Sequence, residues 1–462
     1  MSAVKSVTSG RQARSQAGPP CRILIISQVT EGGVAACLRD VVEVAVSAGY
    51  DVTVACPSTC DLAAWAVQRG GRWERLEMRR SPHPSDVMAV ARIRRLARSS
   101  DLVHLHSSKA GAVGRLALAS LGRQRPPSVF TPHAWSWLVG GRLSPAYRIF
   151  ERIMLPVTSA VVAVSEEEKA EALAVLGARA ARIEVNLNGV DVGRFCPQGP
   201  VTGRPAEPLL VCVGRLCRQR APDVAVAALA QMQTPGVRLR LVGDGEDRPA
   251  LEAQIGALGL TGRVELVGFR PDPAPDLRAA DVVVIPSRYD GMALVLLEAM
   301  ACGAAITATR VAGSSVLEGA GQLIPAEDPA SLARAADALL ADPGRRRRLR
   351  RAARRAAVDK CRLQLSLEGT LRLWQRLGAC PGLRSSVRGP PCVRLGGQGG
   401  CIELERVSPR DDTRARSQDP LASQAGLPDC RCGGRGRRHG RAAYQAQGLP
   451  VDVVSSPAPG LG

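Results

Sequence analysis

Aromatic side chains are scarce in this sequence: only 3% of its 462 residues are Phe, Trp or Tyr. Proteins that bind single strands or splayed RNA bases stack these bases on aromatic rings, and this composition offers little material for such a surface. No nucleic-acid recognition motif is present either, so we do not expect a nucleic acid as partner. The excess of 62 Lys and Arg over 42 Asp and Glu therefore favours an anionic lipid surface or a phosphorylated substrate.

Features that mark secreted and membrane proteins are also missing. Residues 1–21 contain three basic residues but no apolar core of a signal peptide. The longest apolar stretch, Met292 to Ala308, is interrupted by Glu298 and is too short to span a bilayer. The fourteen cysteines form neither a paired CxxC pattern nor a regular disulfide ladder, which favours reduced thiols. We therefore predict a cytoplasmic protein.

Short apolar segments alternate with helical patterns between residues 22 and 377. The first series of expected strands comprises residues 22–27, 51–55, 102–105, 128–131 and 160–164, and the second comprises 209–213, 237–242, 264–267, 281–285 and 304–307. Continuous apolar strands separated by helices are typical of parallel sheets that are covered on both faces. The predicted fold class is α/β, with two Rossmann-like, doubly wound domains.

The predicted organisation has six parts. They are a flexible arm (1–21), an N-terminal domain (22–192), a Gly/Pro-rich linker (193–205), a C-terminal domain (206–357), a closing helix (358–378) and a disordered tail (379–462). The tail prediction rests on composition, because 23 of these last 84 residues are Gly or Pro. The abrupt onset of the tail is also compatible with an altered reading frame.

Ligands of open α/β sheets bind beyond the carboxyl ends of the strands, so the loops there hold the candidate functional residues. A glycine pair ending at Gly33 opens a helix and allows a phosphate or sugar to approach the backbone. After the expected strand 209–213, Gly214 is followed by Arg215 and Arg220, two arginines that could hold a diphosphate from two sides. Taken alone, each of these segments also fits an ordinary strand-to-helix loop.

The segment 286–300 is the richest in candidates. Asp290 and Gly291 lie in its loop, and amides at a helix start near Ala293 can face a diphosphate or a sugar oxygen. Glu298 follows about two turns later, where a carboxylate can accept both hydroxyls of a ribose. The alternatives are a turn or helix cap for Asp290 and a salt bridge within the helix for Glu298.

These segments resemble the retaining glycosyltransferases of the GT-B fold, family four, in which two carboxylates lie eight residues apart, as Asp290 and Glu298 do here. The resemblance covers residues 22–377. Seven further motifs occur in the family's order: Glu31–Val34, His104–Gly111, Thr131–Trp135, Ala163–Ser165, Asn188–Asp191, Val213–Arg215 and Leu241–Gly245.

The resemblance implies two Rossmann-like domains facing a cleft and the transfer of a hexosyl or pentosyl group with retention of configuration. The donor would be a UDP- or GDP-sugar, and the acceptor would be a hydroxyl, for example on a lipid-linked glycan or a polysaccharide precursor. No cofactor and no metal are implied, because arginines take the place of a cation. Association with the inner face of a membrane is the further partner that such acceptors suggest.

The resemblance also implies residue roles in donor binding and transfer. Glu298 would bind the ribose, and Asp290 would bind a hydroxyl of the donor sugar. His133 would lie near the reacting carbon. The diphosphate would be neutralised by two side chains, those of Arg215 and Arg220. Backbone groups would line the donor at six positions: Gly33, Gly214, Gly291, Met292, Ala293 and Leu294.

Two positions depart from the family pattern, which usually has Glu in place of Asp290 and Lys in place of Arg220. The acid is one methylene shorter, and the base is a planar fork instead of a point charge. A catalytically weakened homologue that only binds nucleotide sugars or acts as a scaffold is therefore the alternative. A nucleotide-sugar epimerase is a further GT-B possibility, which the 290–298 pattern fits less well.

The sequence alone does not assign a single role to two other groups of residues. His104 and His106 are expected to support the site, one directed into the core and the other toward the ligand, and no third ligand is spaced to make a metal site with them. The arginine-rich stretch 345–355 is expected to be either a solvated helix face or a surface for anionic lipid.

Overall fold

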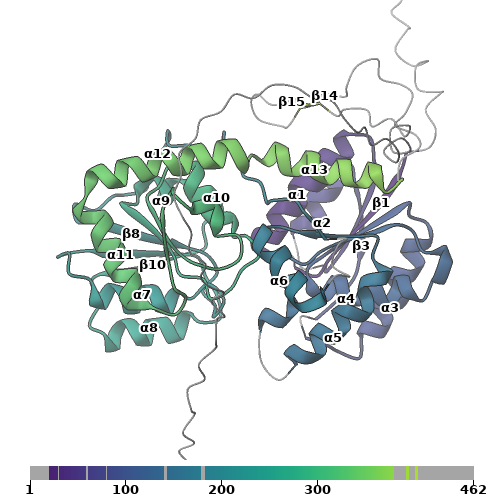
Figure 1. Ribbon diagram of the computed structural model, residues 1–462, viewed down its shortest axis with the longest axis horizontal. Helices are drawn as coiled ribbons and strands as arrows, with labels where there is room; N and C mark the ends of the chain where they lie inside the picture. Colours follow the sequence, from purple (N-terminus) through teal and green to yellow (C-terminus); the bar gives the residue numbers. More distant parts are fainter. Residues whose placement is uncertain are drawn as a thin grey trace, which may run out of the picture. The chain divides into compact units, whose positions relative to one another are not determined.

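The computed structural model describes residues 20–29, 31–58, 61–79, 81–139, 143–177 and 183–378, together with the backbone of two short strands at 392–394 and 401–403. These residues form two parallel α/β sheets, as predicted, and each sheet is flanked by helices (Figure 1). Among the helices that the structure describes, none is long and apolar enough to cross a bilayer.

The first sheet has seven parallel strands in the order β3-β2-β1-β4-β5-β6-β7. The strands are β1 (Arg22–Ser27), β2 (Asp51–Cys56), β3 (Arg72–Arg75), β4 (Leu102–His106), β5 (Ser128–Thr131), β6 (Ala160–Ala163) and β7 (Ile183–Val185). Five of them coincide with predicted strands, whereas β3 and β7 are not predicted from the sequence. Both are short edge strands with partly exposed side chains, so neither presents the continuous apolar run of a buried strand.

Helices cover both faces of the first sheet. They are α1 (Gly32–Ser47), α2 (Asp61–Gln68), α3 (Asp86–Arg98), α4 (Ser108–Ala119), α5 (Ser144–Met154) and α6 (Glu166–Leu176), with short turns η1 (Gly122–Gln124), η2 (Ser136–Val139) and η3 (Leu155–Val157). Successive side chains of β1 enter opposite cores: Ile23 and Ile25 enter one, and Leu24 and Ile26 enter the other. Burial on both faces explains why β1 is apolar at each position from Ile23 to Ile26.

The second sheet has six parallel strands in the order β10-β9-β8-β11-β12-β13. They are β8 (Leu209–Val213), β9 (Arg238–Val242), β10 (Val264–Gly268), β11 (Val282–Ile285), β12 (Ile306–Thr309) and β13 (Gln322–Ile324). The short edge strand β13 is not predicted from the sequence, and β12 begins two residues later than predicted. The predicted segment begins with Ala304 and Ala305, which are buried but lie outside the ladder.

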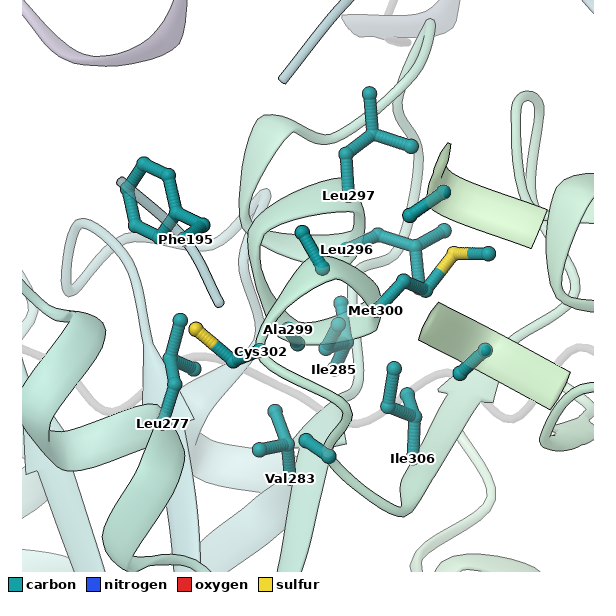
Figure 2. Close-up of a cluster of buried hydrophobic side chains, with 14 of the residues drawn as sticks. Phe195, Leu277, Val283, Ile285, Leu296, Leu297, Ala299, Met300, Cys302 and Ile306 are labelled. Carbon is teal, nitrogen blue, oxygen red and sulfur yellow. The ribbon is translucent and has the colours of Figure 1, made fainter. Parts of the chain in front are cut away.

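The remaining helices are α7 (Pro222–Gln231), α8 (Arg248–Ala257), α9 (Ala274–Ala279), α10 (Leu294–Ala301), α11 (Pro329–Ala341), α12 (Pro343–Lys360) and α13 (Leu363–Arg376), with the short turn η5 (Ser315–Leu317). Figure 2 shows the buried side of α10, where Leu296 and Met300 lie among Val283, Ile285 and Ile306 of the sheet. This packing fixes the helix whose first turn carries the candidate donor-binding backbone.

Helix α13 belongs to the core of the first sheet although it follows the second sheet in sequence. Leu367, Leu371 and Trp374 are almost completely buried in the core that contains Ile23 and Ile25, and α13 lies beside α1 (Figure 1). The chain therefore returns to the first sheet after completing the second.

Most of the predicted disordered tail, residues 379–462, lies outside the described residues, and so does most of the predicted arm, residues 1–21. Within the tail segment, β14 (Cys392–Arg394) pairs with β15 (Cys401–Glu403) in antiparallel fashion.

Candidate functional site

Two loops at the carboxyl edge of the second sheet are joined by an ion pair. β8 pairs with β11, so the loop after β8 lies beside the loop after β11. Arg220 from the first loop forms a salt bridge with Asp290 from the second, and its Nη1 lies 3.4 Å from the Ser287 hydroxyl. Asp290 is buried, and its other oxygen accepts the N–H of Gly291 at 3.0 Å. The carboxylate is thus held on both sides.

The two positions that depart from the family pattern, Asp290 and Arg220, are therefore direct partners. The shorter acid faces the longer base, so the length lost by the carboxylate is offset by the reach of the guanidinium. The expected roles place these two residues on separate parts of the donor, so the pair is not predicted from the sequence.

Further contacts between the same two loops were not predicted. The backbone N–H of Arg288 donates to the carbonyl of Gln219 at 2.9 Å, and the Gln219 amide donates to the carbonyl of Tyr289 at 3.2 Å. The Arg288 guanidinium also binds Asp223 at 2.6 Å and Glu327 at 2.7 Å. These polar residues look like ordinary loop positions in the sequence, because the contacts depend on which strands are neighbours.

Glycine is required where the loop after β8 meets the end of β9. Gly214 and Gly243 have φ angles of 153° and 143°, which side chains rarely tolerate. A Cβ on Gly243 would lie 2.0 Å from the carbonyl oxygen of Gly214. Gly214 also lies beside the aliphatic part of Arg220, so the backbone of this loop is closely packed at its start.

Helix α10 points an uncapped N-terminus toward this edge. Its N-cap residue Ala293 has no side chain that could accept a hydrogen bond, and its first turn contains no acidic residue. The free N–H groups and the helix dipole make such a terminus attractive to an anion. Met292 and Ala293 are buried, and the carbonyl of Met292 accepts a hydrogen bond from the Asn188 amide at 2.9 Å.

Glu298 lies on α10, where it is half-buried near both basic and acidic side chains. Burial raises the pKa of its carboxyl to about 7, while Arg194 and Arg220 lower it and Asp272 raises it. No residue in the described part of the chain donates a hydrogen bond to this carboxylate. Its oxygens are therefore available to hydroxyl groups of a ligand.

Three histidines meet at the carboxyl edge of the first sheet. The Nδ1 of His106 lies 3.1 Å from the Nε2 of His133, and the Nε2 of His104 lies 2.9 Å from the Thr131 hydroxyl. Burial lowers the pKa of His133 to about 4 and that of His104 to about 3, so both rings are neutral at pH 7.

The expectation that His104 and His106 point in different directions is wrong. Residues two apart on a strand project from the same face, and the two rings lie 3.9 Å apart. Both are buried, and only His106 contacts His133. In the described residues, no group of three or more His, Cys, Asp or Glu side chains is arranged to hold a metal.

Contacts also link the predicted residues of the two sheets. A Cβ on Gly291 would lie 2.9 Å from the Ala134 nitrogen and 3.0 Å from the carbonyl carbon of His133. One on Gly33 would lie 3.5 Å from the Leu294 side chain. Glycine at 291 therefore permits the close approach of the Asp290 loop to the turn that carries His133.

Arg215 is the predicted side chain that the structure does not bring into this network. It is exposed, and in the described part of the chain it forms no ion pair with an acidic residue. The other predicted side chains, Asp290, Arg220, Glu298 and His133, lie on the loops and the helix described above.

Two family descriptions match this chain. Residues 31–194 match Glycosyltransferase Family 4, and residues 207–342 match Glycosyl transferases group 1. A D-inositol 3-phosphate glycosyltransferase of Kineococcus radiotolerans is 33% identical over an alignment of 308 residues, which covers 58% of this chain and 70% of the relative. The chain is a member of glycosyltransferase family 4.

Further similar proteins agree with this membership. The D-inositol 3-phosphate glycosyltransferase of Kribbella flavida is 32% identical to this chain over an alignment of 284 residues, which covers 55% of this chain and 66% of the relative. The chain thus spans about two thirds of the length of the curated relatives that it matches.

Solved structures show the same fold. The match with the sucrose-phosphate synthase of Thermosynechococcus elongatus has a TM-score of 0.67 at 23% identity. It covers 78% of this chain and 99% of the synthase chain. The match with Anabaena Alr3699/HepE in complex with UDP-glucose has a TM-score of 0.64 at 23% identity. It covers 77% of this chain and 99% of the HepE chain. The predicted GT-B architecture is confirmed by this likeness.

The ion pair in this family 4 chain predicts energetic coupling between two substitutions. Arg220→Lys and Asp290→Glu should each lower the free energy of unfolding by about 1 kcal/mol, because each spoils the match in length. The double variant should lose less than the sum, with a coupling of at least roughly 0.5 kcal/mol. Urea denaturation measures all three. The control is the double-mutant cycle of Arg310→Lys and Glu318→Asp at an exposed ion pair, where the two changes in unfolding free energy should be additive. Additive changes at Arg220 and Asp290 would contradict the prediction.

The raised pKa of Glu298 predicts a pH dependence of stability. The folded carboxyl keeps its proton up to about pH 7, whereas the unfolded one loses it near its usual value of 4.5. The contribution of Glu298 to the free energy of unfolding should therefore fall as the pH rises from about 5 through 7. Glu298→Gln should raise the free energy of unfolding by roughly 2–3 kcal/mol at pH 8 and leave it unchanged at pH 4.

Urea titrations at pH 4, 6 and 8 check this dependence. Glu318→Gln, at a well-exposed position, is the matched control and should change stability equally little at each pH. An effect of Glu298→Gln that is the same at pH 4 and pH 8 would show that the buried carboxylate carries no pH-dependent cost.

Proposed function

We propose that the chain is a retaining glycosyltransferase that moves a sugar from a nucleotide-diphosphate sugar to a hydroxyl acceptor. The observation that carries the proposal is the grouping, at one sheet edge, of the Arg220–Asp290 pair, the uncapped start of α10 and the unbonded Glu298 carboxylate. A cation and helix N–H groups suit a diphosphate, and a free carboxylate suits ribose hydroxyls.

The proposed mechanism needs no metal. Arg220, Arg215 and the first amides of α10 stabilise the negative charge that grows on the diphosphate as the bond to the sugar breaks. The transition state resembles an oxocarbenium ion, and the acceptor hydroxyl attacks from the face that the diphosphate leaves. The departing phosphate oxygen takes the proton of that hydroxyl, and the configuration is retained because the new bond forms on the same face of the sugar.

Asp290 and His133 have supporting parts in this proposal. Asp290 holds the Arg220 guanidinium and offers an oxygen to a hydroxyl of the donor sugar. His133 stays neutral because burial lowers its pKa, so it can share a hydrogen bond with the sugar without placing a positive charge beside the reacting carbon.

UDP-glucose is the donor to test first, because Anabaena Alr3699/HepE has been crystallised with it and with UDP. The names of the curated relatives suggest inositol 3-phosphate as a first acceptor. Lipid-linked glycans are the acceptors that the family resemblance suggests.

Donor binding tests the proposal. A thermal-shift panel of UDP-, GDP- and ADP-sugars should raise the unfolding midpoint for one base. Glu298→Ala should abolish that shift, because the ribose loses its carboxylate partner. Glu252→Ala, a half-exposed carboxylate on α8, is the control and should keep the shift. No shift with any of the three bases would contradict the proposed donor class.

A catalytically weakened homologue is the alternative, and the shorter acid at Asp290 is the observation that favours it. The same preparation separates the two functions. Release of the nucleoside diphosphate from the donor that gives the thermal shift, in the presence of a hydroxyl acceptor, supports transfer. Binding without any turnover supports a binding or scaffold role.

We further propose that helix α12 contacts the inner face of a membrane. Its arginines divide by face: Arg350 and Arg354 donate to backbone carbonyls of the second domain, whereas Arg347, Arg351 and Arg355 are exposed. The exposed arginines lie one helical turn apart and form a basic stripe suited to anionic lipid.

Vesicle binding tests this stripe. Arg351→Glu with Arg355→Glu should weaken sedimentation with vesicles that contain phosphatidylserine by about tenfold or more, because each basic residue near the surface contributes about 1 kcal/mol. Arg95→Glu with Arg98→Glu, two exposed arginines of α3, is the matched control. Binding that is insensitive to salt or to the α12 reversal would contradict the proposal.

A further inference from the structure

The turn that follows β5 has an unusual backbone. His133 has a φ of 56° and Ala134 a φ of 109°, although neither is glycine. Residues held in such regions cost about 1–3 kcal/mol each and persist only where the surroundings enforce them. Since this turn carries His133, whatever enforces it also decides where the imidazole lies.

The carboxylate of Glu168 binds this turn directly. Its Oε1 accepts the N–H of Ala134 at 2.7 Å, and its Oε2 accepts the N–H of Val164 at 2.6 Å. Glu168 is completely buried. One side chain therefore ties the strained turn to the end of the neighbouring strand β6.

Helix capping does not explain this carboxylate. Ser165 is the N-cap of α6, and its hydroxyl accepts the N–H of Glu168 at 3.1 Å. In a capping box, the acid at this spacing would bond back to the N–H of the N-cap residue itself. Here it bonds the residue before the cap and a residue 34 positions earlier. The carbonyl of Glu168 also accepts the indole N–H of Trp135 at 2.9 Å.

The arrangement is costly, which argues against an incidental contact. No Lys, Arg or His in the described part of the chain forms an ion pair with Glu168. Burial raises the pKa of Glu168 to about 7; the N–H groups of Val164 and Ala134 lower it, and nearby Glu171 and Asp290 raise it. A glutamine would avoid the buried charge, but it has one acceptor oxygen for two N–H groups.

We propose that Glu168 is a positioning residue: its two carboxylate oxygens hold the His133–Ala134 turn so that His133 faces the donor sugar. The inference rests on the proposed transferase function. The imidazole is held from its other side by His106 at 3.1 Å, and Gly291 of the Asp290 loop lies against the same turn. Glu168 thus acts through His133 and does not itself touch the donor.

A pair of matched variants tests the proposal. Glu171 lies on the same helix, and its carboxylate accepts the Trp137 indole N–H at 2.7 Å without contacting the turn. Glu168→Gln should lower kcat for transfer roughly ten- to hundredfold, because a misplaced turn misplaces His133. It should leave the Kd for UDP alone within about twofold, since the proposed UDP contacts are on α10 and on the loop after β8. Glu171→Gln should leave both values within about twofold.

A second variant separates positioning from folding. Glycine adopts a φ of 109° without strain, so Ala134→Gly added to Glu168→Gln should restore much of the thermal midpoint. The proposal predicts that kcat stays low in this double variant, because a relaxed turn is no longer held in place. Recovery of kcat together with the midpoint would overturn the proposal, as would an unchanged kcat in Glu168→Gln.

The imidazole of His133 provides a readout that does not depend on sugar transfer. The chain has only five histidines, so the ring signals of His133 can be assigned by their loss in His133→Gln. The ring ¹⁵N shifts should change in Glu168→Gln and not in Glu171→Gln. Unchanged shifts overturn the role of Glu168 even if the enzyme is active. Absence of transfer by the wild type, with shifts that change as expected, contradicts only the proposed function.

Discussion

Parallel pairing between strands that are distant in sequence is the constraint on which the candidate site depends. β8 lies between β9 and β11, so the loops after these strands end at one edge, and Arg220 meets Asp290 across 70 residues of sequence. In the first sheet, β4 pairs with β5, which brings His106 to His133. Each contact follows from strand order and register, because parallel strands present their carboxyl ends at the same side of a sheet.

Desolvation of ionisable side chains is the second physical effect that shapes the candidate site. Burial lowers the pKa of His133 and raises the pKa values of Glu168 and Glu298 to about 7. The structure compensates each buried acid differently. Asp290 has a guanidinium, Glu168 has two backbone N–H groups, and Glu298 has neither, which leaves it open to a ligand. The three carboxylates thus differ in their partners, and Glu298 accepts no hydrogen bond from the residues that the structure describes.

Close backbone approach is the third influence. Gly214 and Gly243 share a contact that admits no side chain, and Gly291 lies against the turn that carries His133. Where the chain does not use glycine, at His133 and Ala134, the positive φ angles are held by contacts from elsewhere in the fold. The strain is therefore local, but the carboxylate that binds the turn comes from Glu168 of α6.

Local sequence determined the alternation of apolar strands and helices, the α/β class and the loops that hold the ligand-binding candidates. Side-chain periodicity and glycine turns depend on residues that are close together in the sequence, so a linear pattern contains them. Local sequence did not reveal the edge strands β3, β7 and β13, whose partly exposed side chains lack a continuous apolar run. Tertiary structure alone decided that Arg220 pairs with Asp290 and that His104 and His106 project from the same face of their strand. It also decided that the carboxylate of Glu168 binds the N–H of Ala134 instead of the N-cap residue of its own helix. These contacts depend on strand register, on burial and on the geometry of two acceptor oxygens, none of which a linear spacing records.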